Sequence, residues 1–406
     1  MKDNEKSKRE VTIMNVLDKS IQQLSNGSVV TLDNGEHIFK LGSFEGNPII
    51  KPQDLGLTWH VDGELKIGAV FNGGAEVFQD RVMLMPRCHQ GYFEGKFVDP
   101  GTGIERICLE NYVSEIWPLV SEDGINFSRF RDIVIRGDGT DHQDFIYGIE
   151  DIRIIKYDQR YLLIGCGKTG PAFKAAKADR VAVYSTNDFV NITYHGIIES
   201  FDSRNAVPFP GLINGQQYML LRFHPDICLD VLETGIDQLL SPDTHIKYWK
   251  EIYERRSNNL LLRAGGYPHE KEKIGPGTQV IKTDKGWLVI YHAVGEIEYD
   301  ICKAYGLAEN IERGYSICAA LLDLDNPRKV LCRTRKPIYI PSAPYELYGN
   351  DQYPIDVPAV VFPVGAFVRK GKLVLYVGSG DKYIILLSCN LKNLINYLWE
   401  YCKYGA

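Results

Sequence analysis

A short pattern that recurs five times along the chain is the strongest constraint on its fold. Each copy is a polar turn followed by a strand rich in aromatic and aliphatic residues. The copies are Asp80–Met85, Asp158–Ile164, Asn214–Leu221, Asp284–Tyr291 and Lys370–Val377. Their spacing of 56 to 86 residues is too irregular for a WD40-like array, but each interval can hold a four-stranded sheet. Radially repeated sheets of this size form a β-propeller, whose central channel receives one inner strand from each blade.

Helical spacing of apolar residues appears mainly at the two ends of the chain, over 11–24 and 390–402. The charged stretch 245–263 is the one internal segment with a helical pattern. We therefore predict an all-β, five-bladed β-propeller with N-terminal and C-terminal helical extensions. The predicted parts are a tail and helix over 1–30, a single propeller domain over 31–388 and a C-terminal helix over 389–406. The alternative is a pair of β-sandwich domains, which would need a linker near the middle of the chain. No Pro/Gly/Ser-rich segment occurs there.

Composition narrows the class of protein. With 406 residues, 44% of them hydrophobic, the chain can bury a large core without disulfides or a structural metal. A net charge of −6 argues against nucleic acid or an anionic membrane as the main partner. No signal-peptide pattern and no apolar run of about 18 residues is present. The nine cysteines form no CxxC pair, so we expect reduced, buried thiols and a cytoplasmic location.

The segment Tyr147–Tyr157 places charges inside an apolar, β-branched strand. On a regular strand Glu150 would point to one face while Asp151 and Arg153 share the other. One interpretation is a structural ion pair between Asp151 and Arg153 at a sheet edge. The other is a functional carboxylate, and residues elsewhere in the chain favour it.

Polar residues interrupt several other apolar segments. A propeller would bring them together with Asp151 at one mouth of its channel; they are Asn72, Arg87, Arg204, Arg222, His292 and Asp381. Taken singly, each has an ordinary structural explanation. Together, carboxylates, an amide, arginines and a histidine suit a sugar plus an oxyanion. Inverting hydrolysis usually needs two carboxylates, whereas attack by phosphate needs one acid and a set of groups that hold the anion.

Other chemistries have little support in the sequence. There is no HExxH motif, and Asp141–Asp144 (DHQD) looks like a loop, so we predict no metal site. Gly275–Thr278 and Gly165–Lys168 lack the spacing and the following helix of a phosphate-binding loop. No G-x-S-x-G motif for a serine hydrolase appears.

The motifs resemble those of glycoside hydrolase family 130, the inverting β-mannoside phosphorylases and their hydrolytic relatives. Asn47–Ile50 (NPII) looks like the family's NPIL, Phe71–Gly74 (FNGG) like FNPG, Gly148–Arg153 (GIEDIR) like GxEDPR and Gly286–Ala293 (GWLVIYHA) like GWLxxYHG. The segments Ala320–Pro327, Pro344–Gly349 and Val360–Pro363 follow in family order. The match covers most of residues 47–388, and the family's fold is a five-bladed propeller.

The resemblance implies roles for the site residues. Asp151 would be the general acid, thought in this family to relay its proton through a sugar hydroxyl. Contacts to the mannosyl unit would come from Asn72, Arg87 and Asp381, and contacts to phosphate from Arg204, Arg222 and His292. Three positions depart from the family motifs: Ile152 and Gly73 replace prolines, and Ala293 replaces a glycine. The spacing of Leu221–His224 (LRFH) also differs, which leaves His224 as an alternative to Arg222.

The sequence therefore predicts a β-mannoside phosphorylase that inverts the anomeric centre and releases α-D-mannose 1-phosphate. A β-mannosidase on the same fold and a non-catalytic sugar-binding propeller are the alternatives. The expected partners are a small carbohydrate and inorganic phosphate as co-substrate, with no other cofactor, no nucleic acid and no membrane; a homo-oligomer is possible. The linkage, β-1,4 or β-1,2, and the acceptor sugar stay open.

Overall fold

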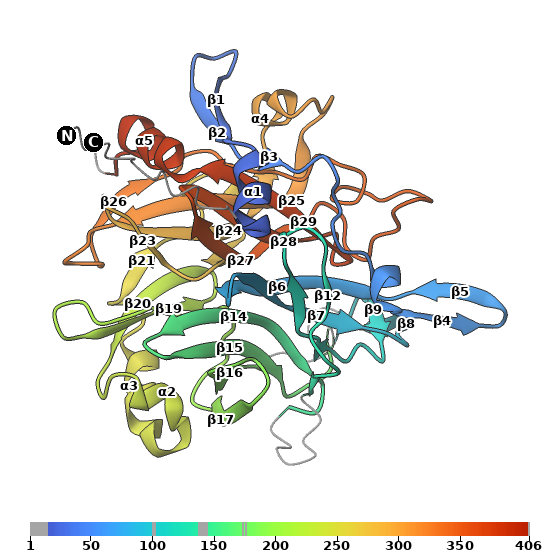
Figure 1. The fold of residues 1–406 in the computed structure, drawn as a ribbon, viewed down its shortest axis with the longest axis horizontal. Coiled ribbons are helices and arrows are strands. Elements are labelled where there is room, and N and C mark those ends of the chain that lie inside the picture. The colour runs from blue at the N-terminus through green and yellow to red at the C-terminus, as the bar shows by residue number, and fades with distance from the viewer. Residues whose placement is uncertain (1–14, 100–102, 137–144, 173, 175–176, 405–406) are drawn as a thin grey trace, which may run out of the picture.

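Five sheets of four to six strands lie around a common centre and form a five-bladed β-propeller (Figure 1). This computed structural model describes residues 15–99, 103–136, 145–172, 174 and 177–404. The predicted all-β propeller is confirmed. The predicted tail, the first residues of the predicted N-terminal helix and the segment 141–144 lie outside the described residues.

The blades follow one another along the chain. Blade 1 holds β6 (Ala69–Phe78), β7 (Arg81–His89), β10 (Glu115–Ile116), β11 (Leu119–Ser121), β12 (Ser128–Arg129) and β13 (Ile135–Arg136). Blade 2 holds β14 (Ile149–Tyr157), β15 (Arg160–Lys168), β16 (Asp179–Thr186) and β17 (Ile192–Ile198). Blade 3 holds β18 (Val207–Pro208), β19 (Gln217–Phe223), β20 (Asp226–Leu232) and β21 (Leu260–Leu262).

Blade 4 holds β22 (Lys273–Pro276), β23 (Ile281–Lys282), β24 (Trp287–Ile297), β25 (Ile311–Leu322) and β26 (Val330–Arg333). Blade 5 holds β27 (Val361–Arg369), β28 (Lys372–Ser379), β29 (Tyr383–Asn390) and β3 (Gly42–Ser43). Three two-stranded hairpins lie outside the blades: β1 (Ser28–Thr31) with β2 (His37–Lys40), β4 (Thr58–Val61) with β5 (Glu64–Ile67), and β8 (Phe93–Val98) with β9 (Glu105–Glu110).

The five repeated turn-and-strand segments fall on the same element of every blade, the strand after the inner one: β7, β15, β19, β24 and β28. Their turns are tight because polar residues adopt left-handed backbone conformations there. Asp80, Asp158 and Asn214 have φ values of 59°, 51° and 51°. Asp and Asn reach this region at lower cost than other residues with side chains. The repeat in the sequence is therefore the repeat of the blade.

A strand from the N-terminal part of the chain completes the last blade. Gly42 and Ser43 of β3 pair with Ser388 and Leu387 of β29, although more than 340 residues separate the two strands in the sequence. The ring is thus closed by main-chain hydrogen bonds between the beginning and the end of the propeller.

The described helices lie at the periphery. They are α1 (Val16–Gln23), α2 (Asp237–Leu240), α3 (Ile246–Glu254), α4 (Tyr299–Ala304) and α5 (Leu391–Tyr401), with 3-10 turns η1 (Pro52–Leu55), η2 (Pro242–His245) and η3 (Pro268–Glu270). The predicted terminal helices correspond to α1 and α5. The predicted internal helix over 245–263 was too long, because it ends at Glu254 and its last residues form β21. The short α2 and α4 were not predicted, since one or two turns carry little periodicity.

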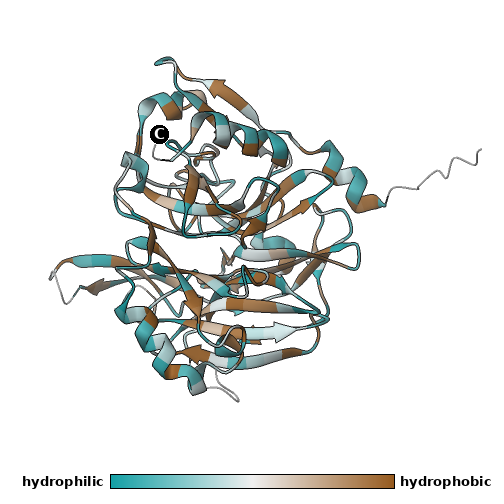
Figure 2. Ribbon diagram, turned by 90° about the vertical axis from the view of Figure 1, so that its left-hand side faces the viewer, coloured by the Kyte–Doolittle hydropathy of each residue, from teal (hydrophilic) through white to brown (hydrophobic). Residues whose placement is uncertain are grey.

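The hydrophobic core is divided among the interfaces between neighbouring blades. Met83 of β7 packs in one cluster with Ile154 of β14, between blades 1 and 2. Similar clusters fill the other four interfaces. Leu17 of α1 enters the cluster between blades 5 and 1, and Leu394 of α5 the one between blades 4 and 5. Figure 2 shows hydrophobic stretches along the strands and mixed character on the peripheral helices.

Two further sequence expectations concern cysteines and membranes. All nine cysteines lie among the described residues, and each is a buried, free thiol. Within the described residues, no helix has the length and apolar character needed to cross a membrane.

The inner strands approach one another so closely at the axis that several positions admit only glycine. A Cβ on Gly74 of β6 would lie closer than 3.0 Å to backbone atoms of Ile152, Arg153 and Ile154 of β14. A Cβ on Gly365 of β27 would meet the backbone of β6 in the same way. These contacts close the middle of the channel.

We expect Gly74→Ala to lower the free energy of unfolding by about 1–3 kcal/mol, because the new methyl group meets backbone that cannot move without displacing a neighbouring blade. The measurement is denaturant-induced unfolding. Gly211→Ala is the matched control, since nothing lies within 4 Å of the added Cβ there. Equal stability of the two variants would contradict this account of the channel.

Candidate active site

A polar pocket lies at the end of the channel where the inner strands begin. Its lining residues come from all five blades and their adjoining loops: Asn72, Arg87, Asp151, Arg204, Arg222, Lys273, Tyr315, Val357, Val360, Phe362 and Asp381. Six of the seven residues predicted from the sequence therefore line one pocket. The seventh, His292, lies behind its wall.

Left-handed backbone conformations aim several of these side chains into the pocket. Asn72, Asp151 and Asp381, which line the pocket, and Asn205, which follows the lining residue Arg204, have φ values of 52°, 52°, 49° and 60°. The strand pairing slips at the first two positions, so the regular alternation of side chains breaks there. Each of the four is Asn or Asp, the types that adopt this conformation most readily after glycine. Such strain gathers at functional sites.

The break on β14 corrects one sequence expectation. Glu150 and Asp151 were expected on opposite faces of the strand, but both contact the same two arginines. Arg87 lies 2.7 Å from Glu150 and 3.4 Å from Asp151. Arg204 donates to Glu150 and lies 3.4 Å from Asp151. A uniform extended strand could not produce this arrangement; the bulge between Glu150 and Arg153 does.

Glu150 acts as a buried counter-ion. Burial alone would raise the pKa of its carboxyl, but the charges of Arg87, Arg204 and Lys168 outweigh burial and hold the pKa below its usual value. Glu150 is therefore ionised and holds Arg87 and Arg204 in position. Asp151 is the acid that lines the pocket, and Asn72 Nδ2 donates to its Oδ1 at 3.0 Å.

Arg153 does not pair with the Asp151 carboxylate, so the interpretation of a structural ion pair is wrong. Its guanidinium instead donates to three main-chain carbonyls: Asp151 at 2.8 Å, Gly277 at 2.9 Å and Pro276 at 3.3 Å. Burial lowers the pKa of Arg153 to about 10. The side chain joins blade 2 to blade 4 across the axis and holds the strained backbone of Asp151 in place.

One side of the pocket carries positive charge without counter-ions. In the described part of the chain, no carboxylate lies within ion-pairing distance of Arg222 or Lys273, and Arg222 Nε has no hydrogen-bond partner. Burial and the charge of Arg204 lower the pKa of Arg222. Lys273 lies 5.2 Å from the ring centre of Tyr315. An anion would relieve this concentration of charge.

His292 and His224 differ in their relation to the pocket. His292 is fully buried, and its ring centre lies 4.4 Å from that of Phe362, which lines the pocket. Burial and the charges of Arg222 and Lys273 hold its pKa well below its usual value, so it offers a neutral ring rather than a cation. His224 is exposed and does not line the pocket. Of the two alternatives, Arg222 is the side chain that faces it.

Sequence reasoning missed Lys273, Tyr315 and the counter-ion role of Glu150. Lys273 had a detectable signal, because it begins an inner strand just as Asn72 and Asp151 lie near the start of theirs. Tyr315 had none, since it lies within β25 and belongs to none of the quoted motifs.

A different cluster carries side chains of the types that bind metals. His269, Glu270 and Cys318 are buried with their potential ligand atoms within 4.8 Å of one another. The Glu270 carboxylate, however, accepts hydrogen bonds from Tyr291 at 2.8 Å and from Arg333 at 2.6 Å. The guanidinium already neutralises this carboxylate, so the cluster fits a structural network better than a cation site.

Comparison with known proteins gives consistent matches. A family model described as beta-1,4-mannooligosaccharide phosphorylase matches residues 44–400. The 1,2-beta-oligomannan phosphorylase of Thermoanaerobacter sp. (strain X514) is 29% identical over 283 residues, 70% of this chain and 81% of that protein. A beta-1,2-mannobiose phosphorylase from the same organism is 28% identical over 352 residues, 86% of this chain and 96% of that protein.

Solved structures share the fold. Beta-1,2-mannobiose phosphorylase from Listeria innocua, in complex with beta-1,2-mannobiose, has a TM-score of 0.63 at 22% identity, covering 88% of this chain and 99% of that one. A GH130 structure from a group of glycoside hydrolases that target beta-1,2 mannosidic linkages in Candida mannan has a TM-score of 0.62 at 18% identity, covering 87% of this chain and 95% of that one.

The pH dependence of stability tests the environment of Asp381. Burial, with smaller contributions from Asp151 and Asp356, raises its pKa from 3.8 to about 6. Between these values the folded protein keeps a proton that the unfolded chain has lost. Stability should therefore fall as pH rises from about 4 to about 6, with a slope that can reach about 1.4 kcal/mol per pH unit for this group.

Asp381→Asn should lack this contribution, and Asn tolerates the left-handed backbone equally well. We expect its stability relative to the wild type to increase across that window, measured by denaturant unfolding at several pH values. The exposed Asp284→Asn is the control. Parallel profiles for Asp381→Asn and the wild type would show that Asp381 is not desolvated.

Proposed function

Because the chain belongs to glycoside hydrolase family 130, we propose that it is a β-mannoside phosphorylase. It cleaves the glycosidic bond with inorganic phosphate, inverts the anomeric centre and releases α-D-mannose 1-phosphate. The curated relatives are named for β-1,2- and β-1,4-linked substrates, and both linkages are candidates here.

The observation that carries the proposal is the pair of cations without counter-ions, Arg222 and Lys273, in the same pocket as the acid Asp151. Water as the nucleophile needs a carboxylate to activate it and gains nothing from such a cradle. Phosphate needs no base, and guanidinium and ammonium groups bind it with charge-assisted hydrogen bonds. The charge distribution favours phosphorolysis over hydrolysis.

We assign roles to the lining residues on this basis. Asp151 gives a proton to the bridging oxygen, directly or through a sugar hydroxyl, while the bond from the anomeric carbon breaks. Phosphate attacks the opposite face of that carbon, held by Arg222, Lys273 and Arg204. A proton from phosphate then restores the acid. The neutral His292 ring packs against Phe362 behind the pocket wall and adds no charge to the cradle.

The sugar occupies the other side of the pocket in this proposal. Asn72, Arg87 and Asp381 offer an amide, a guanidinium and a carboxyl for its hydroxyls. Arg87 is held in position by Glu150 and by the ring of Phe71, whose centre lies 4.1 Å from its guanidinium carbon. Gly378 leaves room for the Asn72 amide, which a Cβ at that position would overlap.

The deciding experiment is incubation with β-1,2-mannobiose and β-1,4-mannobiose, with and without inorganic phosphate. We expect mannose 1-phosphate from at least one substrate only when phosphate is present. Asp151→Asn, nearly isosteric with the wild type, serves as the blank and should lose about 10²–10⁴-fold in rate. Release of free mannose at the same rate without phosphate would instead identify a β-mannosidase, and no release from either would favour a sugar-binding propeller.

The phosphate assignment is tested more sharply at Arg222 than at Arg204, since removing Arg204 would also leave Glu150 short of a partner. Arg222→Ala should raise the KM for phosphate by about 10- to 100-fold, as expected for losing a charged hydrogen bond of about 1.5–3 kcal/mol. The KM for the mannoside should change little.

Arg222→Lys should recover part of the loss, because lysine restores the charge but not the two-pronged geometry. The exposed Arg160→Ala is the matched control and should behave as the wild type. An unchanged KM for phosphate in Arg222→Ala, with an increased KM for the mannoside, would move Arg222 to the sugar side.

A further inference from the structure

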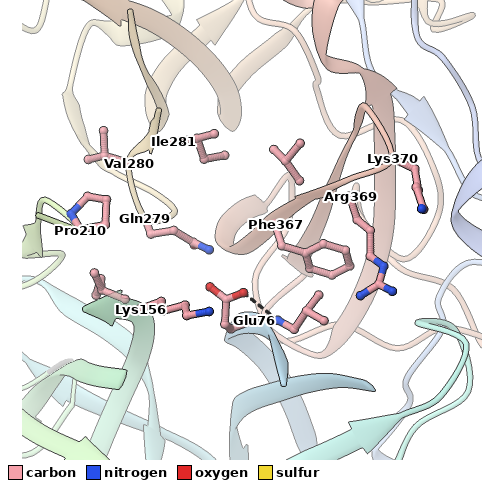
Figure 3. A pocket seen from close by; sticks show the side chains of 12 residues that line it. Glu76, Lys156, Pro210, Gln279, Val280, Ile281, Phe367, Arg369 and Lys370 are labelled. Carbon is pink, nitrogen blue, oxygen red and sulfur yellow. Dashed lines mark hydrogen bonds between the residues drawn. The ribbon is translucent and has the colours of Figure 1, made fainter. Parts of the chain in front are cut away.

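A second pocket lies at the opposite end of the channel, where the inner strands end (Figure 3). It has a volume of about 520 Å³ and is lined by residues from all five blades. Glu76 comes from β6, Ile155 and Lys156 from β14, and Phe367 from β27, with Gln279 just after β22. The two pockets have no lining residue in common.

The middle of the channel separates the two pockets. Gly74 of β6 lies against the backbone of β14, and Gly365 of β27 lies against the backbone of β6. The buried Arg153 side chain reaches the carbonyls of blade 4 at the same level. The second pocket is therefore a separate cavity rather than an extension of the first.

Gln279 lines the second pocket and contains a buried hydrogen-bond acceptor without a partner among the described residues. The Gln279 amide nitrogen donates to the carbonyls of Ala366 and Ala75. Because both partners are acceptors, the nitrogen must face them and Oε1 must point away. Gln279 is only 8% exposed, and its Oε1 has no hydrogen-bond partner among the described residues. This oxygen has almost no accessible surface, so a ligand in the pocket would contact the Gln279 side chain without bonding to Oε1.

Glu76 adds a second polar group beside it. Its Oε1 accepts only from the Val77 N–H, at 2.8 Å, in the described structure. Burial raises the pKa of Glu76 to about 7, and Lys156, which points toward it in Figure 3, lowers the pKa in part. A neutral hydroxyl group can donate to this carboxylate or accept from its protonated form.

The charges at the rim do not suit an anion. Arg369 is paired with Asp18 and, at 2.9 Å, with Asp80, and Lys370 lies 3.3 Å from Asp18. The third cation, Lys156, faces Glu76. Arg369 and Lys370 are thus paired with carboxylates, unlike Arg222 and Lys273 of the first pocket.

The remaining walls are apolar and come from Val77, Ile155, Pro210, Val280, Ile281 and Phe367. Apolar walls around a few convergent polar groups are typical of small-molecule sites. We infer that this pocket binds a neutral, hydroxyl-rich ring such as a pyranose sugar, whose hydroxyls form hydrogen bonds with the Glu76 carboxyl group. Its C–H faces then contact the apolar walls. This inference does not depend on the proposed reaction at the other end of the channel.

The test uses the full chain with isotope-labelled Ile and Val methyl groups, followed by NMR during titration with D-mannose. Ile155, Val280 and Ile281 report on the second pocket, whereas Val357 and Val360 report on the first. We expect the three methyls of the second pocket to shift in a saturable way. Responses of the first pocket test the proposed function separately, so either proposal can fail without the other.

Val368→Trp should fill the second pocket from its rim and weaken this binding by about tenfold or more. Lys156→Trp closes the pocket from the other side and serves if the first variant fails to fold. The matched control is Val29→Trp, at an exposed position on β1 outside both pockets. Val29→Trp should bind mannose at the second pocket as tightly as the wild type does. The response of the first-pocket reporters to mannose should be the same in all variants.

Two results would overturn the inference. The first is that the methyl signals of Ile155, Val280 and Ile281 do not shift during the titration, or that they shift equally in the filled and control variants. The second is that 1,4-dioxane, a ring of similar size without hydroxyl donors, shifts them as strongly as mannose does. In that case the pocket would be an apolar cavity without recognition of hydroxyl groups.

Discussion

Close contact between inner strands at the axis is the constraint on which the rest of the structure depends. Where β6, β14 and β27 meet, Gly74 and Gly365 leave no space for a side chain. Arg153 adds a cross-axis link through carbonyl groups of Pro276 and Gly277. The channel is therefore not a pore. It is a solid centre with a polar depression at each end, and each depression receives side chains from every blade.

Charge differs between the two ends because the partners of the cations differ. At the end where the inner strands begin, Glu150 neutralises Arg87 and Arg204 but leaves Arg222 and Lys273 uncompensated. At the other end, Asp18 of α1 compensates Arg369. The same scaffold thus provides one cavity suited to an anion together with a sugar and one suited to a neutral molecule. The difference depends on a few side chains and not on the fold.

The architecture and most of the site were accessible from the sequence because both rest on local patterns. Polar turns before apolar strands identified the second strand of each blade, and Asp151 stood out as a charge within an apolar strand. Reasoning from a uniform extended backbone failed where the backbone is not uniform. It placed Glu150 and Asp151 on opposite faces and allowed an Asp151–Arg153 ion pair as one interpretation, because a left-handed residue within a strand cannot be recognised by counting alternate positions. Lys273 and Tyr315 were missed because their importance comes from charge balance across blades.

Closure of the ring through β3 has a consequence for how the chain reaches its structure. During synthesis the residues of β3 emerge early, but their pairing partner β29 emerges only near the end. Until then blade 5 lacks its outermost strand, and the interfaces on both sides of it are incomplete. Contacts of such long sequence separation are slow to form, because a large loop must close before they contribute. The nascent chain therefore carries open strand edges for most of its translation, a period in which pairing with other chains competes with closure.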